Sequence, residues 1–357
     1  MGTEGHQRAT WFLAEQFRQA GWQTHSEAFA PTTPVLDASA PLQLELLRND
    51  GTRERSLSRR IEFCEHPHST PHPEAAEGEA VHLSTAASLQ QSGVMVESVP
   101  QGAAFTQLAA HLAQQGASGI LAPLYAQASG YLTRRIMAGS PVALPVLSVC
   151  ADLLPSLEGR RLCARVPVVV RQTQGYNVLA QREGRDKHWS KMPLLIGAHY
   201  DGVGDDVGGP RLPGATDNAA AVAVLLEVAR VLALSPVPPK RPLHLVAFDA
   251  EEVGAQGSRW AAAHYRAQRM TPLLLNLDGA ACLNEAVWVE GGSLTEPVMQ
   301  VLDQAGQRLE IPLILGTVAS DQRSFAASGF PAVGLSVGAA ALHTPEDTIE
   351  RVESAAL

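Results

Sequence analysis

Residues 194–201 read Leu-Leu-Ile-Gly-Ala-His-Tyr-Asp. A short run of apolar and small residues such as this one predicts a buried parallel strand. Side chains two positions apart on a strand point the same way, so His199 and Asp201 would leave its carboxyl end side by side. Open α/β sheets place their ligand crevices at that edge. Because a metal-binding imidazole commonly donates its other N–H to a carboxylate, this pair is compatible with a metal site as well as with an ordinary polar strand end.

Later predicted strands are also followed by titratable residues. These strands alternate with predicted helices, a pattern typical of a mostly parallel α/β sheet, and they cover residues 243–249, 273–277 and 331–337. The polar residues that follow strands or open helices are Asp217, Glu251, Glu252, Asp278 and His343. Each has an ordinary explanation by itself, such as helix capping or a favourable position in a first helical turn. Their joint placement at one edge of one sheet instead predicts a single site.

Two imidazoles with several carboxylates are a suitable ligand set for a pair of divalent ions, and zinc is the natural choice for mixed nitrogen and oxygen ligands. The adjacent Glu251 and Glu252 cannot easily share one role. One of them would bind metal, and the other would act as a general base toward a bridging water or hydroxide. A two-metal site lowers the pKa of that water and clamps both the attacking and the carbonyl oxygens. The predicted reaction is therefore the hydrolysis of an amide bond.

Five motifs carry a family resemblance over residues 173–357. They are His199-Tyr-Asp201, Gly-Ala-Thr-Asp-Asn-Ala (214–219), Phe-Asp-Ala-Glu-Glu-Val-Gly (248–254), Asn276-Leu-Asp278 and His-Thr-Pro-Glu-Asp-Thr (343–348). Their order and composition resemble those of the co-catalytic zinc aminopeptidases, which include secreted bacterial leucyl aminopeptidases, aminopeptidase Y and glutamate carboxypeptidase. The resemblance implies a zinc-dependent exopeptidase that hydrolyses the N-terminal peptide bond of its substrate. It also implies a mixed, mostly parallel sheet flanked by helices.

The resemblance implies a role for each residue of the site. One zinc ion would take His199 and Asp278, the other would take Glu252 and His343, and Asp217 would bridge the two. Other divalent ions would fit the same ligands.

The family resemblance also implies roles for two further residues and the conformation of one peptide bond. Glu251 is the expected general acid and base, and Asp201 is the expected partner of the His199 ring. The family often has a cis peptide bond after its bridging aspartate, so Asp217–Asn218 is expected to be cis. The family usually has a histidine after Ser-Asp near the substrate pocket, whereas this chain has Gln322, which leaves its side-chain specificity open.

The chain is long enough for two domains. Residues 1–40 and 173–357 are expected to form the discontinuous catalytic domain, with residues 41–172 as a smaller inserted α/β or β-rich domain. The helix predicted over residues 6–20 is similar to the first helix of the family. Residues 93–170 resemble a protease-associated domain, chiefly in Gly-Ala-Ser-Gly-Ile-Leu (116–121) and Leu-Pro-Val-Leu-Ser-Val (144–149).

Composition bounds the possible partners. The formal net charge is −9 and no basic run stands out, which argues against nucleic acid or an anionic membrane and leaves a peptide substrate as the expected partner. The oligomeric state stays open. Most family members are secreted, which implies a secreted or periplasmic protein, but the first ten residues, MGTEGHQRAT, contain no apolar core of a signal peptide. The resemblance also implies a closing helix after the last motif, whereas the sequence ends at Leu357.

Three alternatives remain at this stage. Gly334-Leu-Ser336-Val-Gly338 fits the nucleophile elbow of a serine hydrolase, although that fold needs a long helix directly after the serine. The same metal scaffold would also serve a deacylase, a carboxypeptidase or a glutaminyl cyclase. A binding protein without catalytic activity is the third alternative, and the intact ligand set argues against it.

Overall fold

The computed structural model describes residues 1–69, 72–100, 102–133, 142–282, 286–292 and 294–357. The chain forms two compact units. Unit 1 consists of Met1–Pro31, Thr173–Gly204 and Leu212–Leu357. Unit 2 consists of Thr32–Gln172 and Asp205–Arg211.

This division differs from the expected domain boundaries in two places. β2 (Thr32–Leu36), which we expected in the catalytic domain, belongs to unit 2 because it pairs antiparallel with β11 (Val168–Gln172). The short segment Asp205–Arg211 also belongs to unit 2, although sequence order places it between His199 and Asp217. Contacts between residues far apart in the chain set both boundaries, and the local sequence pattern does not contain them.

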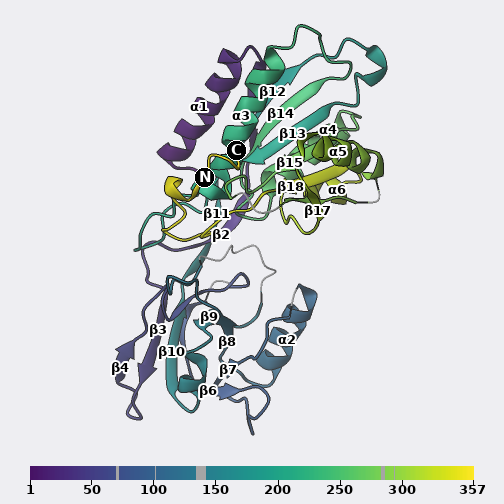
Figure 1. Cartoon of the computed structure of the whole chain (residues 1–357). Coiled ribbons are helices and arrows are strands. Elements are labelled where there is room, and N and C mark those ends of the chain that lie inside the picture. The colour runs from purple at the N-terminus through teal and green to yellow at the C-terminus, as the bar shows by residue number, and fades with distance from the viewer. Residues whose placement is uncertain (70–71, 101, 134–141, 283–285, 293) are drawn as a thin grey trace. The chain divides into compact units, whose positions relative to one another are not determined.

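Unit 1 is built on one eight-stranded sheet, and four of its seven adjacent strand pairs are parallel. This arrangement confirms the mixed, mostly parallel α/β fold (Figure 1). In spatial order the strands are β1 (Gln23–Phe29), β12 (Gly175–Arg182), β14 (Leu243–Phe248), β13 (Leu194–His199), β15 (Leu273–Leu277), β18 (Ala332–Ser336), β16 (Val287–Glu290) and β17 (Leu313–Leu315).

Helices cover both faces of this sheet, and each face has its own apolar core. On one face, α1 (Glu4–Gln19) and α3 (Ala220–Ala233) pack side by side (Figure 1). Their buried Phe17 and Leu225 belong to the same apolar cluster. Full burial of such a side chain stabilises the fold by about 1.5–3 kcal/mol. The apolar side of the amphipathic first helix therefore contributes to stability by packing on the sheet.

The opposite face is covered by α4 (Gln256–Ala267) and α6 (Gln322–Ala327), which contact each other. Their apolar cluster is centred on fully buried rings, Phe248 from the sheet and Phe325 from α6. Another helix, α5 (Glu296–Leu309), precedes the edge strand β17. Because both faces are covered, the central strands β13, β14, β15 and β18 are mostly apolar, and their few polar residues, such as His199, His244 and Asn276, lie at or next to the strand ends.

Unit 2 is a smaller α/β unit with an eight-stranded sheet of its own. In spatial order its strands are β4 (Arg53–Ser56), β3 (Gln43–Leu47), β10 (Arg161–Val166), β6 (His72–His82), β7 (Ser92–Met95), β8 (Gly119–Leu124), β9 (Val146–Cys150) and β5 (Phe63–Glu65). The helix α2 (Ala103–Gln114) packs its buried Phe105 and Leu112 into an apolar cluster with residues of β7, β8 and β9.

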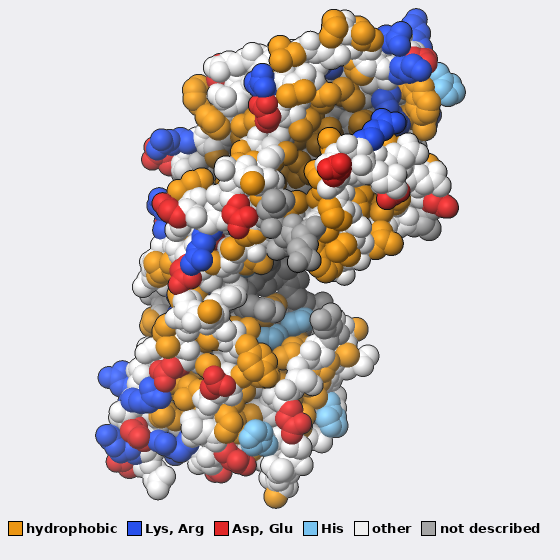
Figure 2. Space-filling model, viewed as in Figure 1, with side chains coloured by type: hydrophobic (Ala, Val, Ile, Leu, Met, Phe, Trp, Pro, Cys, Tyr) orange, Lys and Arg blue, Asp and Glu red, His pale blue; other side chains and the backbone are white. Residues whose placement is uncertain are grey.

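The surface carries charges of both signs. On the face shown in Figure 2, Lys and Arg side chains lie interspersed with Asp and Glu. Within the described ranges, no helix combines the length and apolar character that a membrane span requires.

Candidate metal centre

The predicted site residues of unit 1 converge at the carboxyl ends of its parallel strands. Two groups of side chains lie close enough to hold a metal ion, and within each group the ligand atoms lie within 4.8 Å of one another. The first group is His199, Asp217 and Asp278, and the second is Asp217, Glu252 and His343. Five residues that are far apart in the sequence are thus brought together, and Asp217 belongs to both groups.

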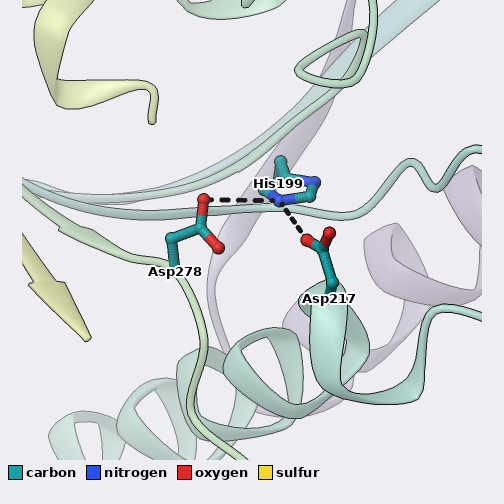
Figure 3. Close-up of side chains that lie close together, drawn as sticks. All are labelled: His199, Asp217 and Asp278. Atoms are coloured by element: carbon teal, nitrogen blue, oxygen red, sulfur yellow. Dashed lines mark ion pairs between the residues drawn. The ribbon is translucent and has the colours of Figure 1, made fainter. Parts of the chain in front are cut away.

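The first group surrounds the His199 ring (Figure 3). Its Nε2 atom lies 3.3 Å from Asp217 Oδ1 and 3.6 Å from Asp278 Oδ2. Two ligand atoms held by one tetrahedral zinc ion at bond lengths of 2.0–2.1 Å would lie about 3.3 Å apart. The observed separations are therefore close to those of a zinc site.

The His199 ring is also held in the tautomer that a metal requires. Its Nδ1 donates a hydrogen bond to the backbone carbonyl of Asp201 at 3.1 Å. In the neutral ring this leaves the Nε2 lone pair directed at carboxylate oxygens, and this buried atom makes no hydrogen bond to the described residues. A cation at that position would satisfy the imidazole and both carboxylates, so the donor set fits a metal ion.

The second group uses the other oxygen of the shared aspartate. His343 Nε2 lies 3.0 Å from Asp217 Oδ2 and 3.0 Å from Glu252 Oε2. Asp217 therefore presents Oδ1 to the group around His199 and Oδ2 to the group around His343. One carboxylate is therefore shared between the two candidate ligand groups.

Negative charge dominates the site and acts on both imidazoles. Burial opposes protonation of His343, but hydrogen bonds and charges from Asp217 and Glu252 outweigh burial and raise its pKa to about 10. At His199, burial is likewise outweighed, chiefly by the charge of Asp278, and the pKa is raised well above its usual value. A site that stabilises positive charge on two imidazoles also favours a divalent cation.

Asp201 has a wider role than orienting one ring. Its carboxylate Oδ1 lies 3.6 Å from His199 Nδ1, beyond hydrogen-bond distance. The two carboxylate oxygens instead accept hydrogen bonds from the backbone N–H groups of Glu251 and Glu252, at 3.0 and 3.2 Å. The strand that carries His199 therefore holds the turn that carries both glutamates.

Glu251 belongs to neither of the candidate ligand groups found in the described part of the chain, but its carboxyl interacts electrostatically with His199, Glu252 and Asp278. Burial raises the pKa of its carboxyl well above the ordinary value, opposed by the charge of His199 and reinforced by Asp321, Glu252 and Asp278. A carboxylate with a raised proton affinity that is not used as a ligand is suited to proton transfer.

Two buried acids at the site received no role from the sequence. Asp347 is almost fully buried, and its carboxylate accepts hydrogen bonds from the backbone N–H groups of Thr216 at 2.6 Å and Asp217 at 3.3 Å. Asp347 lies within the His343–Thr348 motif, and this is the one sequence feature that links it to the site. Asp321 is fully buried, and burial raises its pKa to about 7, opposed by His199 and reinforced by the charges of Asp201 and Asp278.

Replacing Asp347 by asparagine is expected to weaken metal binding by about 10–100-fold, because it loosens the backbone that presents Asp217. Zinc dissociation constants, measured by competition with a chelator, would test this effect. Glu346→Gln is the matched control, because Glu346 precedes Asp347 directly in the sequence and its side chain is exposed. Equal zinc affinities in the two variants would contradict the assigned role of Asp347.

Gln322, which replaces the histidine of the family pattern, has its side chain buried at 2% exposure. Its amide nitrogen donates to the carbonyl of Val318, and its amide oxygen accepts from Asn276 Nδ2 at 3.3 Å. In this chain the position thus supports the interior beside β15 and β18. A Cβ atom at Gly334 would collide with the Gln322 amide, which accounts for the glycine.

The serine-hydrolase alternative is not supported by the geometry around Ser336. Its hydroxyl donates to the Gly279 carbonyl at 3.2 Å and accepts from the Gly338 N–H at 3.2 Å. The nearest histidine in the sequence, His343, is instead held by Asp217 and Glu252. The serine is therefore part of the strand-end packing.

A mostly parallel α/β sheet with this candidate ligand set at its strand ends is typical of metal-dependent hydrolases. The chain belongs to Peptidase family M28, whose profile matches residues 177–357. The Asp217–Asn218 peptide bond is cis, as the family resemblance implied.

Curated relatives align with parts of the chain. A probable leucine aminopeptidase of Arthroderma otae is 29% identical over 183 residues, which cover 47% of this chain and 48% of that protein. Aminopeptidase YwaD of Bacillus subtilis is 30% identical over 123 residues, 34% of this chain and 25% of that protein. The chain therefore aligns with half or less of the length of these curated relatives.

Solved structures extend the similarity of fold to the whole chain. The aminopeptidase from Aneurinibacillus sp. strain AM-1 has a TM-score of 0.70 at 21% identity, covering 99% of this chain and 85% of that one. BSAP, a zinc aminopeptidase from Bacillus subtilis, has a TM-score of 0.73 at 18% identity, covering 99% and 86%. At these identities the comparison establishes the fold alone.

Proposed function

We propose that this protein is a zinc-dependent aminopeptidase with two co-catalytic metal ions. The observation that carries the proposal is the shared position of Asp217, whose two carboxylate oxygens face two separate ligand groups. The membership in Peptidase family M28 and the names of the relatives support the same reaction.

In this proposal, His199 and Asp278 would hold one ion, Glu252 and His343 would hold the other, and Asp217 would contribute one oxygen to each. When bound, the pair of ions supplies an acidified water and a polarised substrate carbonyl. Residues of the chain position the ligands. Asp201 fixes the backbone of the glutamate turn, and Asp347 fixes the backbone at Asp217.

Glu251 is the proposed general base. It takes a proton from the attacking water and later gives that proton to the leaving amine of the cleaved peptide bond. Its raised pKa is suited to both steps, because the carboxyl group has to accept a proton and then hold it until the amine departs.

We also propose that unit 2 contains a protease-associated domain. The two segments that carry the resemblance, residues 116–121 and 144–149, contribute to β8 and β9. These strands pair in parallel next to α2, so the segments lie at the core of unit 2.

Metal dependence tests the reaction class directly. Treatment with 1,10-phenanthroline should abolish hydrolysis of a leucyl-anilide, and added zinc should restore it. A fluorophosphonate that reacts with catalytic serines should leave the activity unchanged. Faster hydrolysis of N-acyl amino acids than of aminoacyl-anilides would instead favour a deacylase on the same scaffold.

A further inference from the structure

The segment between two proposed site residues passes through unit 2. The chain leaves unit 1 after Gly204, three residues beyond Asp201, and it returns at Leu212, five residues before Asp217. Because these connections are short, Asp201 and Asp217 have little freedom to move independently of residues 205–211. We refer to residues 205–211 as the crossing loop.

The crossing loop is closed at its base. Leu212 N–H donates to the carbonyl of Gly204 at 3.2 Å, and the Leu212 side chain is buried. Asp205 and Arg211 form an antiparallel bridge, and Arg211 Nε lies 2.8 Å from Asp205 Oδ1. The loop therefore emerges as a narrow hairpin whose two legs are fixed to each other.

The tip of the crossing loop is bound inside unit 2 by two arginines. The carboxylate of Asp206 accepts from Arg60 Nε and Nη2, both at 2.8 Å, and from Arg59 Nη2 at 2.6 Å. Arg59 also donates to the carbonyl of Val207, whose side chain packs against an apolar core of unit 2. The side chains of Arg60 and Asp206 are 4% and 1% exposed, so water screens this pair little.

The residues that receive Asp206 are themselves held in place. Arg60 Nη2 donates to Glu65 Oε1 at 2.6 Å, which balances the second arginine charge. The backbone of Arg60 has φ of 68°, a left-handed conformation that is uncommon outside glycine. Its N–H donates to the Phe63 carbonyl at 2.8 Å, and its carbonyl accepts from Leu132 N–H. Such a conformation persists where surrounding contacts determine it, as they do here.

We propose that Asp206 is a positioning residue through which unit 2 sets the geometry of the metal centre. By fixing the crossing loop, the pairing of Asp206 with Arg59 and Arg60 restrains the chain that carries Asp201 at one end and Asp217 at the other. Through this covalent connection, unit 2 stabilises the arrangement that binds metal. This inference rests on the proposed two-metal function.

The test compares two variants of the same buried cluster. Asp206→Asn removes the buried charge of the crossing loop, whereas Glu65→Gln removes an equally buried charge that is not on the loop. Zinc stoichiometry and dissociation constants would be measured on the full chain by competition with a chelator. Hydrogen exchange of residues 212–219 would be followed in the same samples.

Asp206→Asn is expected to weaken zinc binding on the order of tenfold and to speed exchange over residues 212–219. Glu65→Gln removes an acceptor of Arg60 but keeps the Asp206 carboxylate, so it should lower the melting temperature and change both readouts less than Asp206→Asn does. Equal effects of the two variants on zinc affinity, or no effect of Asp206→Asn, would overturn the inference.

Two additional results keep the test decisive. Should Asp206→Asn fail to fold, Arg59→Gln removes the Arg59 bonds to Asp206 and to the Val207 carbonyl described above, and it should show the same changes at smaller size. Unchanged zinc affinity and exchange in that variant would overturn the inference. A wild-type protein that binds fewer than two zinc ions would contradict the proposed function itself, which separates the two failures.

Discussion

Replacing Glu251 by glutamine is expected to lower turnover by about 10²–10⁴-fold while leaving both metal ions bound. The amide keeps the size of the side chain but cannot accept the proton of the attacking water. Metal binding should survive because Glu251 lies outside both ligand groups among the described residues. Steady-state rates on an aminoacyl-anilide, combined with metal analysis of the same sample, measure the two effects separately.

The neighbouring residue provides the matched control. Glu252→Gln changes the next side chain in the same way, but it removes a ligand whose Oε2 lies 3.0 Å from His343 Nε2. That variant should lose affinity for one ion together with activity. If Glu251→Gln lost metal and Glu252→Gln kept it, the roles of the two glutamates would have to be exchanged.

Replacing Asp217 by asparagine is expected to weaken both metal ions at once. Each of its carboxylate oxygens faces a different ligand group, at 3.3 Å from His199 and 3.0 Å from His343. The neutral amide offers only one good acceptor and no charge to offset two cations. The loss of affinity should exceed the roughly 10–100-fold typical of a residue that only supports a ligand.

Asp278→Asn is the appropriate comparison, because Asp278 belongs to a single group. It should weaken one ion and leave the other close to its wild-type affinity. Sequential zinc titrations of the two variants would distinguish these patterns. An Asp217→Asn variant that lost only one ion would contradict the bridging role.

The parallel strands and their polar ends could be predicted because both are local signals. The prediction for residues 273–277 coincides with β15, and that for residues 243–249 exceeds β14 by one residue. Once the strands were assigned, sheet geometry placed their carboxyl ends at one edge. The convergence of His199 with Asp278 and of Glu252 with His343 follows from that placement.

Other features depend on contacts that no local pattern encodes. No strand was predicted over Val287–Glu290 or Leu313–Leu315, because such short segments acquire their conformation by pairing at the edge of a sheet. The carboxylate of Asp201 bonds to backbone groups fifty residues later in the chain. The burial of Asp206 against Arg60 also depends on the folded chain. It accompanies the assignment of residues 205–211 to unit 2, which differs from the expected domain boundary.

The most direct test is a crystal structure of the zinc-loaded protein with anomalous data collected at the zinc absorption edge. Two anomalous peaks about 3.5–4 Å apart are expected, with one oxygen of Asp217 directed at each. His199 and Asp278 should contact one peak, and Glu252 and His343 the other. A single peak, or two peaks of which only one contacts Asp217, would contradict the two-metal centre.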